Sequence, residues 1–205
     1  MGFYERRLLP RLIDLAMRNK EVKRYRRKLI PAAAGEVLEI GAGSGLNLPF
    51  YGSQVRRLHA LEPSAALLRM AGRKLPGAPF PVELLRGSAE EIPLADRSVD
   101  TVVTTWTLCS IPDAAKALRE ARRVLRPGGS LLFVEHGHAP DPGVAAWQRR
   151  IEPLWKPLAG GCHLTRRIDQ LIRDAGFSIS ELENEYLKGP RPLTYTYCGR
   201  ARPLA

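Results

Sequence analysis

The chain has 205 residues, of which 44% are hydrophobic and 26% are charged, and its formal net charge is +11. This composition is typical of one globular α/β domain with an N-terminal extension, and no apolar run approaches the roughly 20 residues of a membrane span. Three widely spaced cysteines indicate neither a disulfide framework nor a zinc site. We therefore expect a cytoplasmic protein whose thiols lie in the core or in strands, with no bound metal.

The first 30 residues are strongly basic, because ten lysines and arginines face only three acids and leave a net charge of +7. An apolar stripe predicts one helix over residues 6–28, which Pro10 would kink or break; it consists of Leu8, Leu9, Leu12, Leu15 and Ala16. We expect residues 1–30 to form a helical lid over a ligand site. Contact with an anionic membrane surface is the second interpretation, and nucleic-acid binding is the third and weakest.

From residue 31 to residue 205, short apolar runs alternate with candidate helices. Strands are predicted at 36–41, 57–62, 82–86, 99–105 and 130–135, with helices at 64–75, 113–125, 143–156 and 165–175. Ser64 and Asp113 are the expected caps of the first two helices. Two last strands, near 177–186 and 193–200, are expected to pair antiparallel. We therefore predict a single domain with a Rossmann-like, doubly wound sheet of seven strands, mostly parallel with an antiparallel C-terminal strand.

The first predicted strand ends in Glu39 and a glycine turn. Gly41, Gly43 and Gly45 follow a G-x-G-x-G spacing, which differs from the G-x-G-x-x-G fingerprint of dinucleotide sites. We expect the turn to lead into a helix N-terminus, whose free N–H groups favour a carboxylate, while Glu39 lies where an ammonium group would bind. S-adenosylmethionine carries both groups and fits this pair better than a pyrophosphate does.

Three more strand ends carry matching features. Glu62, after the second strand, is predicted to accept hydrogen bonds from both ribose hydroxyls. The segment 87–94 follows the third strand, so an adenine ring is expected beside Ser88 and the backbone of Ala89. The fourth strand ends at the same carboxyl edge, where ligands bind in open α/β sheets. Together these features predict one nucleoside site.

The chain from Val37 onward resembles the class I S-adenosylmethionine-dependent methyltransferases. The resemblance implies that Glu39 and the glycine turn hold the methionine moiety and that Glu62 holds the ribose. It also implies that Ser88 and Ala89 flank the adenine and that the Thr104 backbone lies near the amino group. Neighbouring positions expected to join this site are Asn47, Pro63 and Glu90. Many family members have aspartate where this chain has Ser88.

A narrower resemblance comes from motifs in the second half, namely Thr107–Ser110, Arg122–Gly129, Glu135–His136, Trp147–Gln148, Pro153–Trp155 and Gly161–Arg166. These look like the methyltransferase-like-7 group, whose animal members methylate thiols, and its bacterial relatives. The chain is more distantly similar to ubiquinone/menaquinone C-methyltransferases and to phospholipid N-methyltransferases. The resemblance implies a small-molecule acceptor, with a thiol or another soft nucleophile first. The animal proteins carry a hydrophobic membrane anchor where this chain has its basic segment.

Methyl transfer from a sulfonium is an in-line displacement whose leaving group needs no proton, so catalysis consists largely of holding acceptor and methyl in line. A thiol must still ionise, and a phenol or carbon acid needs a general base. His136 and His163 are the candidates for proton transfer. The alternative for His136 is a hydrogen bond that shapes the pocket, and for His163 it is loop packing.

Other functions stay open at this point. A quinone-type or phospholipid methyltransferase would act at a membrane surface, and a non-catalytic protein would only bind the cofactor. Methylation of nucleic acid is disfavoured, because Thr104–Thr107 lacks the Asn/Asp-Pro-Pro-aromatic pattern that grips a flipped base. The sequence leaves the acceptor and the oligomeric state open.

Overall fold

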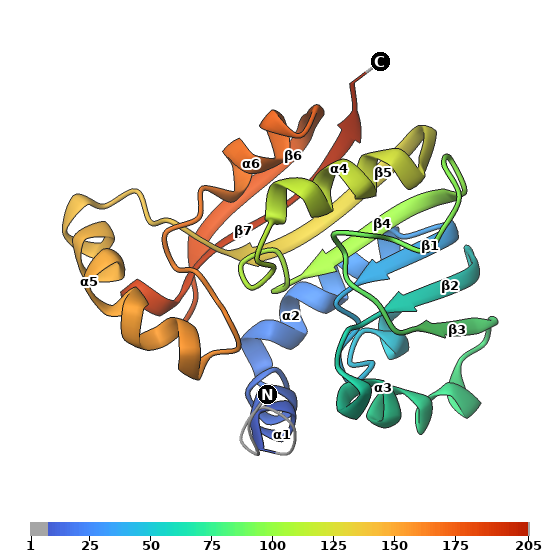
Figure 1. Ribbon diagram of the computed structural model, residues 1–205, viewed down its shortest axis with the longest axis horizontal. Coiled ribbons are helices and arrows are strands. Elements are labelled where there is room, and N and C mark those ends of the chain that lie inside the picture. Colours follow the sequence, from blue (N-terminus) through green and yellow to red (C-terminus); the bar gives the residue numbers. More distant parts are fainter. Residues whose placement is uncertain (1–7, 205) are drawn as a thin grey trace.

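The central strands are apolar on both faces. Val37 and Leu38 in β1 (Gly35–Ile40) are fully buried, as are Val102 and Val103 in β4 (Val99–Thr105), although adjacent side chains of a strand point to opposite sides. Strands of this kind need a layer of helices on each face. The computed structural model describes residues 8–204 and shows this arrangement, a seven-stranded sheet between helices (Figure 1).

The strand order is β3-β2-β1-β4-β5-β7-β6. The remaining strands are β2 (Val55–Leu61), β3 (Val82–Leu85), β5 (Leu125–His136), β6 (Phe177–Tyr186) and β7 (Tyr195–Pro203). The first five pair in parallel, whereas β7 runs antiparallel to both of its neighbours, β5 and β6. The predicted fold is therefore confirmed, and the C-terminal strand is inserted between two others.

Two apolar clusters pack the helices against the two faces of the sheet. On one face α4 (Ala114–Val124) and α6 (Ile168–Asp174) pack over Leu38 and Leu131, and on the other α2 (Lys20–Leu29) packs over Val37 and Val103. Two further helices, α3 (Ala65–Gly72) and α5 (Pro142–Leu158), lie toward opposite ends of the sheet (Figure 1). The predicted caps form, since Leu67 N donates to Ser64 Oγ (3.4 Å) and Lys116 N donates to Asp113 Oδ1 (2.8 Å).

The N-terminal segment differs from its prediction. It forms two helices, α1 (Leu9–Ala16) and α2, and the chain breaks between them rather than at Pro10. Asn19 starts the second helix, because its Oδ1 accepts a hydrogen bond from Val22 N (2.9 Å). Pro10 lies in the first turn of α1, where a missing N–H costs no helical hydrogen bond. Residues 6 and 7 of the predicted helix lie outside the described part of the chain.

No helix within residues 8–204 combines the length and the apolar character that crossing a membrane requires. Cys109, Cys162 and Cys198 are buried free thiols, as the sequence predicts.

Candidate functional site

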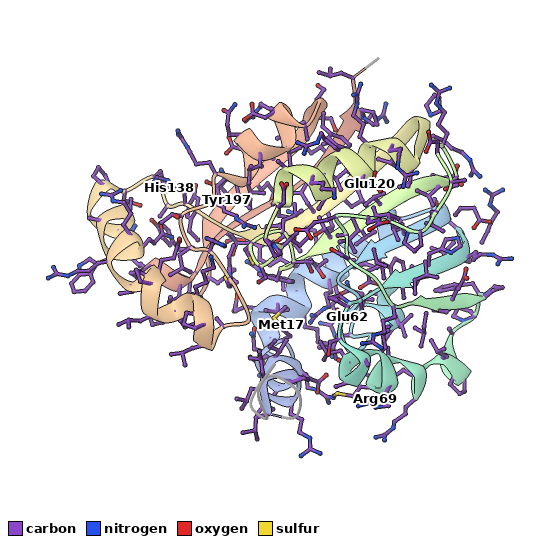
Figure 2. The ribbon with its side chains drawn as sticks, viewed as in Figure 1. Met17, Glu62, Arg69, Glu120, His138 and Tyr197 are labelled. Carbon is purple, nitrogen blue, oxygen red and sulfur yellow. The ribbon has the colours of Figure 1, made fainter. Side chains whose placement is uncertain are left out.

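A cavity of about 300 Å³ lies at the carboxyl ends of β1, β2 and β4. The order of the strands reverses between β1 and β4, and open α/β sheets bind ligands at such a point. The walls come mainly from strand-end loops and from the N-terminal segment, namely residues 39–44, 46–47, 61–63, 87–89, 105–107, 110–112 and 159–160 with Ile13, Met17, Arg26 and, from α3, Leu67. Met17 and Glu62, labelled in Figure 2, line it from the helices and from the sheet respectively.

The glycine turn exposes main chain to this cavity. Gly41 has a φ of 69°, and a Cβ there would lie 2.3 Å from the Thr107 hydroxyl, so only glycine fits. A Cβ on Gly43 would meet only a backbone oxygen, at 3.9 Å, which leaves room for a ligand against the main chain.

The expected helix N-terminus after the turn is absent. A single 3-10 turn, Leu48–Phe50, follows, and Asn47 makes no side-chain cap. The Asn47 side chain is engaged elsewhere, because its Oδ1 accepts a hydrogen bond from Arg26 Nε (2.7 Å) and its Nδ2 donates to Glu39 (2.7 Å) and to Thr105 (3.0 Å). The turn therefore has no helix dipole to offer a carboxylate.

Glu62 occupies the position predicted for ribose binding. Its two oxygens accept hydrogen bonds from Gly43 N (3.0 Å) and Ser64 N (2.9 Å), which fixes the carboxylate at the cavity wall. Burial raises the pKa of Glu62, while the two backbone hydrogen bonds oppose that rise. Each oxygen keeps acceptor capacity, as a ribose diol requires. Pro63 lines the cavity beside it.

Glu39 is fully buried at the base of the same cavity. Its oxygens accept hydrogen bonds from Asn47 Nδ2 (2.7 Å) and from the Tyr51 hydroxyl (2.9 Å). Burial raises the pKa of Glu39 to about 7, although these hydrogen bonds and the charge of Arg26 lower it. The carboxylate therefore orders Asn47 and Tyr51 as well as facing the ligand space.

The predicted adenine segment lines the cavity through Ser88 and Ala89. Three predicted cofactor residues lie outside the lining. Glu90 turns away and accepts a hydrogen bond from Asp113 N (2.7 Å) at the start of α4. Gly45 packs against Leu48 and Ala71, and the Thr104 side chain donates to the buried Glu135 (2.7 Å).

Glu135, to which the sequence assigns only a place in a motif and no role, supports the site from behind the cavity lining. It is completely buried and also accepts hydrogen bonds from Thr107 N (3.1 Å) and Cys109 N (3.4 Å). It thereby holds the loop after β4, including Trp106, whose φ of 51° is unusual for a side chain of this size. A buried acid directly after four apolar strand residues was the available signal.

The cavity has an apolar end. Ile13 lies beside Gly160, on which a Cβ would be 3.5 Å away, and Met17 packs against the apolar cluster that contains Trp106. These four residues and Ile111 line the cavity. Among the described residues, those that line the cavity include no histidine, lysine or cysteine. This end suits an apolar acceptor, and it places no proton acceptor of the histidine type in direct contact with the bound molecule.

The two histidine candidates lie behind this surface. His136 ends β5 and meets Trp106 edge to face, with ring centroids 6.5 Å apart. His163 Nδ1 lies 3.3 Å from Glu152, and its backbone N donates to Cys109 O (2.8 Å). Burial lowers the pKa of His163, and the charge of Arg166 lowers it further.

Two cysteines adjoin His136. Cys109 and Cys162 form a small buried cluster with Leu164 beneath α5. A hydrogen bond from Cys109 lowers the pKa of Cys162 to about 5, with His136 and Trp155 acting in the same direction against burial. The sequence separation of 53 positions gave no sign of this contact.

Comparison with known proteins agrees with this geometry. The model of a methyltransferase domain family matches residues 38–133. The human thiol S-methyltransferase TMT1B is 33% identical over 193 residues, covering 88% of this chain and 77% of the human protein. Its rat counterpart is 38% identical over 154 residues, 72% of this chain and 62% of the rat protein. A phosphatidylethanolamine N-methyltransferase of Cereibacter sphaeroides is 30% identical over 155 residues, 74% of each chain.

A solved structure shares the fold. A SAM-dependent methyltransferase from Methanosarcina mazei aligns with a TM-score of 0.68 at 20% identity, over 91% of this chain and 98% of that one. The residues described above fit S-adenosylmethionine, because open main chain at the glycine turn and the acid Glu62 flank one cavity. S-adenosylmethionine is accordingly the cofactor, and the chain belongs to the class I S-adenosylmethionine-dependent methyltransferases.

Proposed function

We propose that this enzyme transfers the methyl group of S-adenosylmethionine to a small-molecule thiol or a similar soft nucleophile. The observation that carries the proposal is the apolar cavity end, whose described lining has no histidine, lysine or cysteine. A thiol, with a reference pKa of about 8.5, supplies its own anion near neutral pH, whereas a phenol or carbon acid needs an adjacent base. The thiol S-methyltransferase relatives support this acceptor class.

When bound, S-adenosylmethionine supplies an electrophilic methyl group on a sulfonium. The protein then has to hold the acceptor in line, exclude water and favour the thiolate. Trp106, which lines the cavity, offers a flat wall for this purpose.

The test is a methyl-transfer assay with purified protein on thiols, phenols, quinones and amines. We expect thiols to react fastest, with rates that rise about tenfold per pH unit below the pKa of each thiol. Trp106→Phe should raise KM for the thiol and leave the affinity for S-adenosylhomocysteine within about threefold, because Trp106 faces the acceptor end. The matched control is Trp147→Phe, since Trp147 is exposed on α5. Faster methylation of phenols or amines would reject the thiol assignment.

The proton-transfer roles of His136 and His163 belong to the same proposal. His136→Phe should lower kcat and flatten the pH–rate profile if the imidazole accepts the thiol proton through ordered water. An unchanged profile with a raised KM would assign His136 to shaping the pocket. The same assay on His163→Phe tests the second candidate. If His163 only packs the loop, its role is explained by its contact with Glu152.

A second candidate is methylation of a quinone or phospholipid at a membrane surface by a cytoplasmic, peripherally bound enzyme. Exposed apolar side chains of two helices favour it, and we call them the apolar rim. They are Leu8, which precedes α1, Leu12 and Leu15 on α1, and Trp147, Leu154 and Leu158 on α5. Helix α1 and the loop that follows α5 meet at the cavity, because a Cβ on Gly160 would lie 3.5 Å from Ile13 and both residues line the cavity. The phosphatidylethanolamine N-methyltransferase relative is consistent with such an acceptor.

A further inference from the structure

A buried arginine forms part of the cofactor cavity. Arg26, on α2, is 5% exposed and is the one cationic side chain among the described residues that line the cavity. Its Nε donates to Asn47 Oδ1 (2.7 Å), and an Nη donates to the carbonyl of Met17 (2.6 Å). Two of the five N–H groups of a guanidinium are thus engaged within residues 8–204.

This charge has no carboxylate in direct contact. The ion pairs among the described residues do not include Arg26, although the charges of Glu39 and Asp14 act on it from farther away. Burial accordingly lowers the pKa of Arg26 to about 10, against those two acids. Burying a cation with free N–H groups costs free energy unless an anion pairs with it. A carboxylate suits a guanidinium, because its two oxygens can accept two parallel N–H hydrogen bonds.

The position of Arg26 along the sheet edge identifies that anion. Residues 87–89 follow β3 and Glu62 follows β2, so the nucleoside features lie toward β3 and β2. Arg26 instead contacts Asn47 after β1 and Trp106 after β4. The methionine end of the cofactor lies on this β1–β4 side and ends in a carboxylate. The glycine turn has no helix N-terminus to receive that group.

We propose that Arg26 binds the carboxylate of S-adenosylmethionine and makes α2 a part of the cofactor site. Asn47 orients the guanidinium from one side, and it is itself held by Glu39. The sequence presents residues 1–30 as one basic segment without distinguishing its members; in this proposal Arg26 alone among them selects the amino-acid end of the methyl donor. This inference rests on the cofactor and is independent of the acceptor.

Calorimetry with two ligands tests the proposal without any acceptor. S-adenosylmethionine and its decarboxylated analogue differ only by the carboxylate. The wild-type protein should bind the first at least tenfold more tightly. Arg26→Met should weaken S-adenosylmethionine by about 10- to 100-fold, as expected for a charge-assisted hydrogen bond, and leave the analogue within about twofold. Arg27→Met, at an exposed position on the same helix, is the matched control and should change neither affinity.

Equal affinities of the wild-type protein for the two ligands would overturn the proposal, and this comparison needs no variant that must fold. Equal weakening of both ligands by Arg26→Met would overturn it in favour of a structural role. Retained binding of the analogue shows that the variant is folded. A failed acceptor screen with ligand discrimination intact would reject the thiol proposal and leave the role of Arg26 standing.

Discussion

Burial changes the pKa of single acidic residues at this site. Glu39 and Glu135 are acids with almost no exposed surface, and burial raises the pKa of each to about 7 despite several hydrogen bonds. Glu39 orders the side chains around the cofactor cavity, and Glu135 orders the loop that carries Trp106. The free energy of unfolding should therefore depend on pH near neutrality through groups that are usually ionised there.

The raised pKa of Glu39 predicts the direction in which the free energy of unfolding changes with pH. Its folded pKa lies above its ordinary value of 4.5, so the folded state holds the proton more tightly than the unfolded chain. Its contribution is full below about pH 4.5 and is lost as the pH rises through 7, up to about 3 kcal/mol. Relative to Glu39→Gln, the wild-type free energy of unfolding should fall across this window, measured by urea denaturation at a series of pH values. Glu91→Gln, at an exposed carboxyl, is the control, and parallel curves for the wild type and Glu39→Gln would contradict the prediction.

Gly41 gives a steric prediction. Gly41→Ala places a methyl group 2.3–2.9 Å from three Thr107 atoms and at a φ of 69°. We expect a loss of stability of about 2 kcal/mol and at least a tenfold loss of affinity for S-adenosylhomocysteine, since the cavity wall must shift. Gly52→Ala, where a Cβ meets nothing within 4 Å, should leave both quantities nearly unchanged. Thermal unfolding and calorimetry measure them, and wild-type behaviour of Gly41→Ala would show that the loop adapts without cost.

At the scale of elements, the N-terminal helices are fastened to the glycine turn. Asp14 of α1 accepts hydrogen bonds from the Ser44 hydroxyl and from Arg18 Nε (2.9 Å), and Lys74 donates to Ser44 O (2.5 Å). Burial raises the pKa of Asp14, but the hydrogen bonds from Ser44 and Arg18 outweigh it and leave the pKa below its usual value. Helix α1 thus contacts the cofactor loop directly, which supports the proposal of a lid for residues 8–30; residues 1–7 of the predicted lid lie outside the described part of the chain.

Asp14→Ala should loosen this lid. The expected effect is faster hydrogen exchange in α1, unchanged exchange in α2, and a three- to tenfold loss of affinity for S-adenosylhomocysteine. Exchange measured by mass spectrometry reports α1 and α2 in one experiment, and calorimetry gives the affinity for S-adenosylhomocysteine. Arg11→Ala, at an exposed position of α1, is the control. If α1 exchanges at the same rate in both variants, the contact with Ser44 does not hold it.

At the scale of the whole molecule, net charge and exposed apolar side chains both bear on membrane binding. The chain carries a net charge of +11, and the apolar rim lies on α1 and α5, while Ile13 of α1 and Gly160 after α5 line the cavity. Anionic lipid would complement both features, because apolar contact and electrostatic attraction add at a bilayer surface. An acceptor dissolved in the bilayer would then reach the cavity without crossing water.

Vesicle binding tests this arrangement. Sedimentation with vesicles of phosphatidylcholine and 30% phosphatidylglycerol, on the order of the anionic content of membranes, should capture the protein at low salt and release it above about 0.3 M salt. Leu15→Glu and Leu154→Glu, both in the rim, should each weaken capture severalfold. Leu204→Glu, at an exposed leucine of the C-terminal segment, should not. Equal capture of all three variants would show that charge alone drives binding, and no capture would reject the membrane candidate.

Much of the fold and the cofactor side of the site could be predicted, since each feature there is local. A buried strand, a glycine turn and an acid at the next strand end are written in consecutive residues, and parallel pairing brings them to one edge. The prediction placed Glu90 in the cavity wrongly, and the expected helix after the turn is absent, because both features depend on hydrogen bonds between distant segments. The Asp113 backbone N donates to Glu90, and the Asn47 side chain donates to Glu39 and Thr105.

The sequence by itself determined the sheet and the order of the strand-end motifs, because these follow from periodicity and spacing along the chain, and it indicated the methyl donor through the family resemblance that those motifs carry. Only the tertiary structure decided that Arg26 is buried at the cavity while Arg27 next to it is exposed, and that Cys109 and Cys162 meet beside His136. In a run of basic residues every side chain has the same local chemistry. The face of the helix that packs against the sheet decides which of these side chains is buried.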